Sequence, residues 1–331
     1  MQNLERRAPA RPILLSGVRP GDDGDSLLIG DRHKILAAGL SPAILAGALG
    51  RLDGRTSLGE LVAAEPALTL DDAEALVRSL DGAGLIDDAE PPAFRTGAEV
   101  IVELEELVEG YCEETIFQNP FWRACLAVKG PGDLPEKLAI GMIIENWHFL
   151  FRESYFDAPV LSHVDNTAVR LLLNEFFSEE YGHDEILLRA LNFAGLSRED
   201  MADAVPLAET MGLCNALAWW AHTDPLFFFT TLGLLEGQGM KHDSFIEACE
   251  RAALPEGLVG PLRTHANINL NAAHGSLTRS IFAAIPVLDL PTVARLKAQT
   301  RLFVELYDAF YTGVWRHYGS DAPLLRRVSD L

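Results

Sequence analysis

Two acid–histidine pairs are the residues best suited to chemistry in this sequence. Glu145 and His148 are three residues apart in the apolar segment LAIGMIIENWHFLF, and Glu180 and His183 have the same spacing in FFSEEYGHDEILLRAL. On a helix, residues at this spacing project from the same side, about 60° apart. A carboxylate and an imidazole placed in this way are typical ligands of a divalent metal in a helical bundle. Since one such pair is common by chance, its repetition on successive segments carries the prediction.

A third polar segment, THANINLNAAHG, follows later in the chain. Asn267, Asn271 and His274 are spaced so that they would share one helix face. His265 and His274 are nine residues apart, about 180° around a regular helix, so we do not expect both to face one metal. Glu236, in GLLEGQG, is a further acid in an apolar segment.

Long segments of helical periodicity must position these residues. The breaks between them coincide with prolines and glycines, and the segments are expected near residues 98–118, 134–157, 165–194, 199–221, 225–251, 257–283 and 290–317. The fold class is therefore predicted to be mainly α, with a seven-helix domain over residues 99–320.

The beginning of the chain has a different pattern. Short apolar runs at residues 12–15, 26–29 and 34–37 are separated by glycine and aspartate, which is typical of strands and hairpins, and Leu85-Ile86 can return as another strand. We predict a small α+β winged-helix domain over residues 1–90, a linker over 91–98 and a tail over 321–331.

Three helix starts are indicated within this N-terminal domain. Ser41-Pro42 places a cap residue before a proline in the first turn. Ser57 and Glu60 have the spacing of a capping box, and Thr69 and Asp72 repeat it. The third helix should bury one face, which consists of Ala73, Leu76, Val77 and Leu80.

Composition excludes several classes of function. A length of 331 residues with 48% hydrophobic residues predicts about two globular domains. The 48 acidic and 27 basic residues give a net charge of −21, which argues against nucleic acid and anionic membranes as partners. The four cysteines lack a CxxC spacing, and we see neither a signal peptide nor a membrane-spanning run. We therefore expect a cytoplasmic protein.

The helical part resembles the haem-oxygenase-like superfamily. The resemblance is greatest to the iron-dependent oxygenases and oxidases related to pyrroloquinoline-quinone protein C, and it rests on IIENWHFLF, EEYGHDEILLRALNFAGL, LGLLEGQG and INLNAAHG. A ferritin-like bundle is disfavoured because its two acid–histidine helices normally alternate with single-glutamate helices. A thiol nucleophile like that of the helical thiaminases is disfavoured because Cys112 and Cys125 have no partnered base at a recognisable spacing.

This resemblance implies a set of iron ligands. It assigns ligand roles to Glu145, His148, Glu180 and His274, and His274 takes the last position of the family pattern H-x3-D-x2-H. The first two positions of that pattern are Asn267 and Asn271 here, and amides are poorer ligands for Fe(II) than imidazole or carboxylate. One or two Fe(II) ions are therefore implied, with O2 as co-substrate. Further ligands, or residues that orient a ligand, are His183, His265, Asn267, Asn271 and Glu236.

The passage from Val18 to Asp88 resembles the leader-peptide-binding domains of ribosomal-peptide biosynthesis, the pyrroloquinoline-quinone protein D-like modules. The matching stretches are RPGDDGDSLLIGDR, LSPAILAGALGRLDGRTSLGELV and DDAEALVRSLDGAGLIDD. In that family a peptide adds as a strand to the sheet and packs on the third helix. The implied contact residues are Leu27, Leu28, Ile29, Ile35, Leu36, Ala73, Leu76, Val77 and Leu80. The alternative is a generic winged helix that only packs on the main domain.

The two resemblances together imply an iron- and O2-dependent enzyme that oxidises a ribosomally made precursor peptide, with the leader held by the N-terminal domain. Two alternatives stay open. One is a cofactorless oxidase of the quinone-forming kind, and the other is a non-catalytic protein that binds the peptide for separate enzymes. The expected partner is the precursor peptide, a homodimer is left open, and neither nucleic acid nor membrane is expected.

Overall fold

A computed structural model describes most of the chain, namely residues 9–14, 18–20, 26–29, 33–36, 40–82, 85–89, 94–162, 166–235, 244–271 and 277–330. The chain divides into two compact units. The first consists of Met1–Glu114 and Pro286–Lys297, and the second consists of Thr115–Ile285 and Ala298–Leu331. The first unit therefore contains the predicted N-terminal domain together with one further helix and a later segment.

The first unit contains two small antiparallel sheets. One pairs β1 (Pro12–Leu14) with β5 (Ile86–Asp88), and the other has the order β2-β3-β4. Its strands are β2 (Val18–Pro20), β3 (Ser26–Ile29) and β4 (His33–Leu36). The predicted strands lie within a residue or two of β1, β3, β4 and β5, whereas β2 was not predicted. The central strand of the larger sheet is β3, and β2 and β4 form its edges.

The three short helices of the first unit begin where the capping residues predict. They are α1 (Pro42–Leu49), α2 (Leu58–Ala64) and α3 (Leu70–Gly82). The Ser57 hydroxyl accepts the backbone N–H of Glu60 at 3.4 Å, and the Glu60 carboxylate accepts that of Ser57 at 2.8 Å. Thr69 and Asp72 make the same reciprocal pair at 3.1 and 3.2 Å. Both capping boxes are confirmed.

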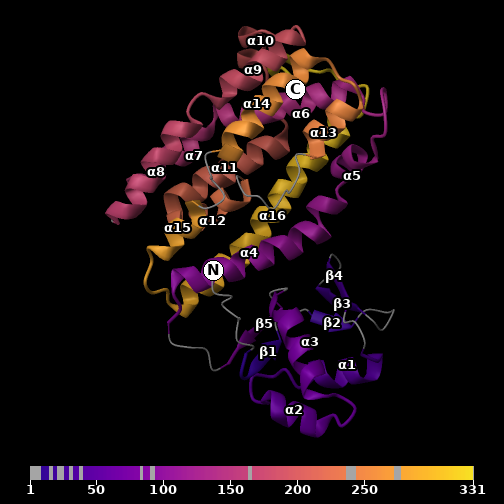
Figure 1. Ribbon diagram of the computed structural model, residues 1–331, viewed down its shortest axis with the longest axis vertical. Helices are drawn as coiled ribbons and strands as arrows, with labels where there is room; N and C mark the ends of the chain where they lie inside the picture. Colours follow the sequence, from indigo (N-terminus) through magenta and orange to yellow (C-terminus); the bar gives the residue numbers. More distant parts are fainter. Residues whose placement is uncertain are drawn as a thin grey trace. The chain divides into compact units, whose positions relative to one another are not determined.

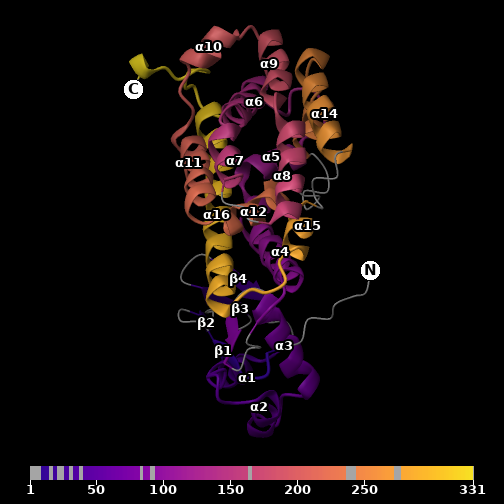
Figure 2. The same ribbon diagram turned by 90° about the vertical axis from the view of Figure 1, so that its left-hand side faces the viewer.

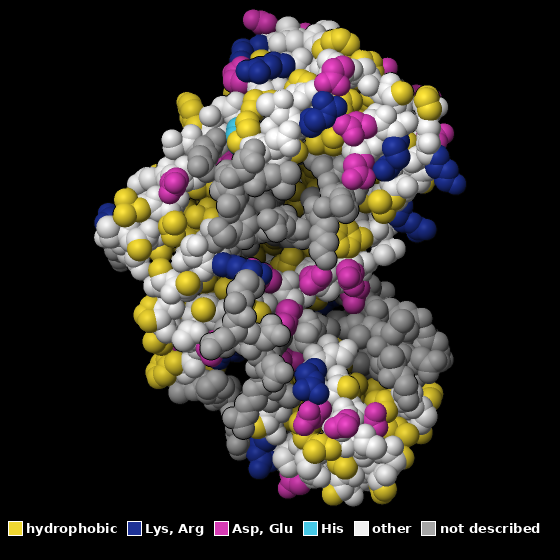
Figure 3. Space-filling view, in the orientation of Figure 1, with side chains coloured by type: hydrophobic (Ala, Val, Ile, Leu, Met, Phe, Trp, Pro, Cys, Tyr) yellow, Lys and Arg dark blue, Asp and Glu magenta, His cyan; other side chains and the backbone are white. Residues whose placement is uncertain are grey.

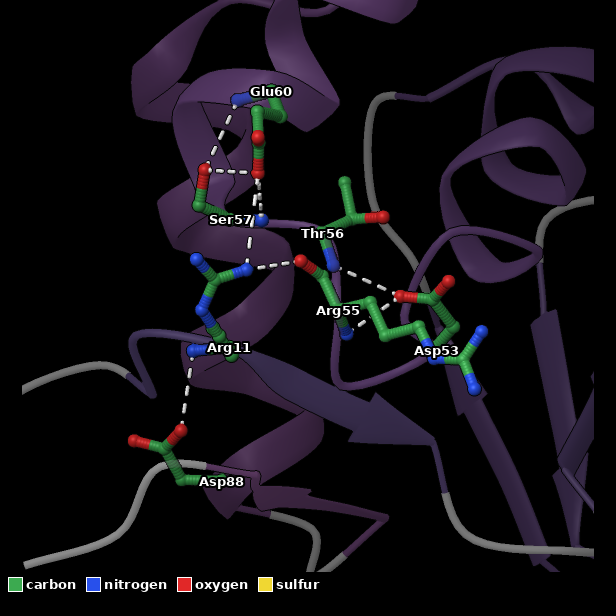
Figure 4. A network of polar contacts seen from close by, with 7 residues as sticks. All are labelled: Arg11, Asp53, Arg55, Thr56, Ser57, Glu60 and Asp88. Atoms are coloured by element: carbon green, nitrogen blue, oxygen red, sulfur yellow. Dashed lines mark hydrogen bonds and ion pairs between the residues drawn. The ribbon is translucent and has the colours of Figure 1, made fainter.

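A polar network ties the loop before α2 to the first strand (Figure 4). The carboxylate of Asp53 accepts the backbone N–H of Arg55 at 2.8 Å, which lowers the pKa of Asp53. The Arg11 guanidinium donates to the Arg55 carbonyl and lies 4.0 Å from the Glu60 carboxylate. The Arg11 backbone N–H donates to Asp88 at 3.1 Å. This network joins β1, β5 and α2.

A buried carboxylate on α4 forms ion pairs that connect this helix to the later segment of the first unit. Glu103 of α4 (Gly97–Glu114) is buried and lies 3.0 Å from the Arg95 guanidinium. It also forms an ion pair with Lys297. Arg95 and Leu288 exchange backbone hydrogen bonds of 3.0 and 2.7 Å. A buried ion is costly unless it is paired, so this cluster fixes where the segment before α16 lies against α4.

The described part of the second unit is helical (Figures 1 and 2). α6 contacts both α9 and α11, α14 lies along α9, and α11 lies along α7. The α-helices, with α16 shared with the first unit, are α5 (Pro120–Ala127), α6 (Glu136–Phe151), α7 (Glu153–Val160), α8 (Thr167–Glu180), α9 (His183–Phe193), α10 (Arg198–Asp203), α11 (Ala208–Thr223), α12 (Pro225–Leu235), α13 (Ser244–Arg251), α14 (Glu256–Asn271), α15 (Leu277–Ala283) and α16 (Leu290–Tyr318).

Several of the predicted long helices are broken within the described ranges. The segment 134–157 breaks at Arg152, and 165–194 breaks at Tyr181 and Gly182, where Gly182 has a φ of 97°. The segment 199–221 breaks before Leu207, because Pro206 has no backbone N–H to continue a helix. The helix α5 was missed, although Asn119 caps it and Pro120 occupies its first turn.

The predicted tail is held in place over part of its length. The backbone N–H of Val205 donates to the carbonyl of Arg326 at 2.7 Å, and the Arg326 guanidinium donates to the carbonyl of Pro206 at 2.8 Å. These bonds hold Arg326 against the loop that precedes α11.

Two further observations concern the apolarity of the helices and the distribution of surface charge. Among the described residues, no helix combines the length and apolarity needed to cross a membrane. On the described part of the face in Figure 3, Lys and Arg side chains are interspersed with Asp and Glu rather than gathered into one basic patch.

Candidate functional site

Glu145 of α6 is buried and hydrogen-bonded on both of its oxygens. Oε2 accepts the backbone N–H of Leu207 at 3.1 Å and the hydroxyl of Thr210, both at the start of α11. Oε1 accepts the hydroxyl of Tyr318, at the end of α16, at 2.7 Å. Burial raises the pKa of Glu145 and also that of Tyr318. The carboxylate of Glu145 thus joins α6, α11 and α16.

A glycine makes the Tyr318 contact possible. Gly141 lies four residues before Glu145 on the same face of α6, and a Cβ built on it would lie 2.1 Å from the Tyr318 ring. The ring therefore packs directly over the helix backbone, and its hydroxyl reaches Glu145. Any larger residue at position 141 would displace this donor.

His148 of α6 is buried and held by Arg152. The Arg152 guanidinium lies 3.1 Å from Nδ1 of His148 and donates to the His148 carbonyl at 3.0 Å. A guanidinium has no acceptor, so Nδ1 must accept and the proton of the neutral ring is on Nε2. Burial, reinforced by the charge of Arg152, lowers the pKa of His148 to about 3. The ring is therefore neutral at physiological pH.

This tautomer bears on the prediction that His148 binds a metal. A ligating nitrogen needs an available lone pair, and the Nε2 of His148 carries a proton while the lone pair of Nδ1 faces Arg152. Within the described ranges, Nε2 has no hydrogen-bond partner. In this arrangement both oxygens of Glu145 and the Nδ1 lone pair of His148 are already engaged by other residues of the chain.

The side chains of Glu180 and His183 do lie together, but the two residues are on different helices and not on the single helix that the sequence predicts. Glu180 ends α8 and His183 begins α9, with a left-handed Gly182 between them. Oε2 of Glu180 lies 2.6 Å from Nδ1 of His183, and both side chains are buried. The pair is therefore formed across a helix break rather than along one helix.

His265 of α14 completes this group. Its ring centroid lies 4.9 Å from that of His183, with the rings nearly perpendicular. Burial lowers the pKa of His265 to about 4, the neighbouring His183 contributes to the shift, and Glu180 opposes it. Nε2 of His265 is buried and has no hydrogen-bond partner within the described part of the chain. We call Glu180, His183 and His265 the Glu180 cluster.

The other predicted ligands are either exposed or outside the residues that the structure describes. Asn267 is exposed on α14. His274, Glu236 and the side chain of Asn271 lie outside the described residues. Among the residues that the structure describes, no group of three or more His, Cys, Asp or Glu side chains is arranged to hold a metal ion by itself.

The predicted peptide-contact residues fall into two groups. Leu27, Leu28 and Ile29 belong to the central strand β3, whose two edges are already paired, so an added strand cannot pair there. Ile35 and Leu36 belong to the edge strand β4. The face of α3 is buried in a hydrophobic core, as its helical periodicity predicts, and consists of Ala73, Leu76, Val77 and Leu80.

Sequence reasoning missed the partners of the predicted residues. Arg152 follows His148 by four positions, the spacing of helix neighbours, and that signal could have indicated it. Tyr318 lies 173 positions from Glu145, and Thr210 lies 65 positions away. No local pattern connects such distant residues, so only the packing of α6, α11 and α16 reveals them.

Comparisons with known proteins identify the fold. No family model matches the sequence, and no curated protein sequence matches it. The chain is similar to a solved structure described as a domain of unknown function with a heme oxygenase-like fold from Shewanella denitrificans OS217, with a TM-score of 0.56 and 19% identity. The match covers 66% of this chain and 93% of that one. At this identity the likeness establishes the fold alone: this is a mainly helical protein with a haem-oxygenase-like fold.

Proposed function

We propose that the protein is a metal-dependent oxidase or oxygenase that holds Fe(II) at the Glu180 cluster. The supporting observation is a buried carboxylate beside one buried and one half-buried imidazole, from α8, α9 and α14. Two histidines and one carboxylate are the ligand set of non-haem Fe(II) oxygenases, which keep open positions for O2 and substrate.

One donor atom of the cluster supports this proposal. Nε2 of His265 is buried without a partner, and the lowered pKa of this histidine keeps its ring neutral, the form that can ligate. His274 is the sequence-predicted residue that could complete the set, because the described side chains do not form a metal-holding group by themselves. Bound Fe(II) would supply the activation of O2. The chain's own residues would hold the ion in a dry interior, where Glu180 supplies the compensating negative charge.

The test is anaerobic reconstitution of the purified full chain with Fe(II), followed by exposure to O2. The expected result is about one iron per chain and O2 uptake that depends on that iron. His222→Ala, an exposed residue of α11, is the matched control and should bind iron as the wild type does. Iron at background level would refute the proposal, and O2 uptake without iron would favour a cofactorless oxidase.

The substrate part of this proposal concerns the first unit. A precursor peptide would add as a strand to β4, and two features of the larger sheet support this edge. β3 is paired on both sides. The other edge strand, β2, contains Pro20, which cannot donate a backbone hydrogen bond. β4 contains no proline and so offers the more complete edge for strand addition.

Peptide binding can be tested with an array of short basic, neutral and acidic peptides and the full-length protein. Because the chain carries a net charge of −21, we expect the basic or neutral peptides to bind. Proline substitutions at successive positions of β4 should abolish binding wherever the outward backbone N–H is removed. The same substitution at Val18 in β2 should leave binding unchanged. Binding that survives every β4 proline in folded variants would exclude this edge.

A further inference from the structure

We propose that Trp147 and His148 form a binding site for the carboxylate of a small molecule with an apolar body. This inference goes beyond the proposed metal chemistry and does not depend on it. It rests on two buried ring N–H groups that lack partners, on a fixed histidine tautomer, and on a neighbouring positive charge.

The first donor is Nε2–H of His148. Arg152 can only donate to Nδ1 of this histidine, so the neutral ring must carry its proton on Nε2. His148 is 1% exposed, and Nε2 meets no acceptor within the described residues. A buried donor that is left unmet destabilises the folded protein, so such a group indicates an acceptor that arrives with a ligand.

The second donor is on the adjacent ring. Trp147 is also 1% exposed, and its Nε1–H likewise has no partner in the described part of the chain. The Trp147 and His148 ring centroids are 5.2 Å apart, at 69° to each other. Two unmet donors on touching rings suit a ligand group that offers two acceptor oxygens.

The charges around the rings favour an anion over a neutral carbonyl. The half-buried Arg152 guanidinium lies beside His148. The nearest acid on the same helix is Glu145, which is occupied by Thr210 and Tyr318. The thiol of Cys214 in α11, which also faces Arg152 and Glu145, stays protonated because burial raises its pKa to about 12. A carboxylate is therefore the acceptor that these groups stabilise best.

An aromatic surface beside the donors suits the apolar body of the ligand. Phe151 stacks on Trp147 with centroids 4.8 Å apart and 12° between the planes, and it is 49% exposed. An aliphatic chain or an aromatic ring bearing the carboxylate could cover this exposed face. We therefore expect hexanoate and benzoate to bind better than acetate, because they bury more apolar surface.

The experiment measures binding of hexanoate and benzoate to the metal-free full chain by calorimetry, with hexanamide and benzamide as uncharged matches. Both carboxylates should bind at least about tenfold more tightly than their amides. Trp147→Phe, which keeps the ring and removes the N–H, should weaken hexanoate binding about tenfold or more, as should His148→Leu. His148→Gln offers an amide N–H near the position of Nε2 and should retain most of the affinity.

Trp219→Phe is the matched control, since Trp219 is an exposed residue of α11 and should leave binding unchanged. Equal binding of acids and amides, or undiminished binding by folded Trp147→Phe, would overturn the proposal. NMR of the wild type with ¹⁵N-labelled histidine supplies a test that needs no stable variant. The His148 ring should show the Nε2–H tautomer, and its signal should shift on addition of hexanoate. An Nδ1–H tautomer would also overturn the proposal.

The outcomes separate this site from the proposed metal function. Carboxylate binding by a protein that takes up no iron would support the Trp147–His148 site and refute the metal assignment. Iron uptake without carboxylate binding would give the reverse result. The two assignments therefore stand or fall on different measurements.

Discussion

Oε2 of Glu180 lies 2.6 Å from Nδ1 of His183, although one residue ends a helix and the other begins the next. Between them, Tyr181 is 89% exposed and Gly182 has a φ of 97°. The left-handed turn directs the exposed Tyr181 outward and leaves the acid and the histidine buried together. The geometry of the Glu180 cluster thus depends on one backbone conformation that favours glycine.

Gly182→Ala should destabilise the protein by about 1–2 kcal/mol, the cost of a left-handed conformation for a residue with a Cβ. Nothing lies within 4 Å of a Cβ built at this position, so the cost is conformational and not steric. The measurement is the free energy of unfolding from denaturant titration. An unchanged stability would show that the turn tolerates another conformation.

Gly141→Ala should destabilise the protein even though alanine is the better helix former by about 1 kcal/mol. The new Cβ would lie 2.1 Å from the Tyr318 ring, and overpacking of this kind typically costs about 1–3 kcal/mol. Gly212→Ala in α11 is the matched control, because a Cβ there meets nothing within 4 Å. The control should be neutral or stabilising in the same thermal melts. Equal melting temperatures for the two variants would show that the close contact between Gly141 and Tyr318 does not affect stability.

Some features of the structure could be predicted from short sequence patterns, and others could not. The sequence indicated that Glu145 needs a partner, because a charged residue within an apolar segment is costly to bury alone, and the structure provides it with three hydrogen-bond donors. The capping boxes at Ser57 and Thr69 were also predictable, because their partners lie three positions away. The helix break at Gly182 was not predicted, since an isolated glycine is tolerated inside a helix.

The partners of Glu145 and the cluster role of His265 could not be predicted either. His265 was judged by its angle to His274 along one helix, whereas its contact is with His183 on α9. Tyr318 and Thr210 reach Glu145 across large sequence separations. Such contacts depend on how helices pack, and the period of a single helix does not contain that information.

The pH dependence of stability should change in His148→Gln. The pKa of His148 is about 3 in the folded protein and 6.5 in its unperturbed state, so the unfolded chain binds more protons between these values. The contribution of the neutral His148 ring to the free energy of unfolding is therefore fully present above about pH 6.5. It is lost as the pH falls towards 3, by up to about 1.4 kcal/mol per pH unit.

The variant lacks this titration, so its stability relative to the wild type should rise as the pH is lowered. His265 and His317 also have lowered pKa values, but both remain in the variant and cancel in the difference. Denaturant titrations at several pH values measure this difference in the free energy of unfolding. A difference that stays constant with pH would show that His148 is not held neutral by burial.

Asn119→Ala should destabilise the second unit by about 2–3 kcal/mol. The side-chain oxygen of Asn119 caps α5 by accepting the N–H of Phe121 at 3.0 Å, and its amide donates to Asp308 and Thr312 of α16, each at 2.8 Å. The loss of a cap costs about 1 kcal/mol, and buried groups left unpaired add to it.

Asn166→Ala at the exposed start of α8 is the comparison for Asn119→Ala, since Asn166 accepts the N–H of Ala168 at 2.9 Å but lies at the surface. It should cost less in the same unfolding experiment. Equal losses would mean that the bonds from Asn119 to α16 contribute little to stability.

The central claim, that the Glu180 cluster holds the metal, is tested most directly by the iron stoichiometry of two variants prepared side by side. His265→Ala should bind little or no Fe(II) after anaerobic reconstitution, because it removes a neutral imidazole from the cluster. His148→Gln should retain about one iron per chain, because Arg152 already occupies the Nδ1 lone pair of that residue. Full iron in folded His265→Ala, or loss of iron in folded His148→Gln, would contradict the account.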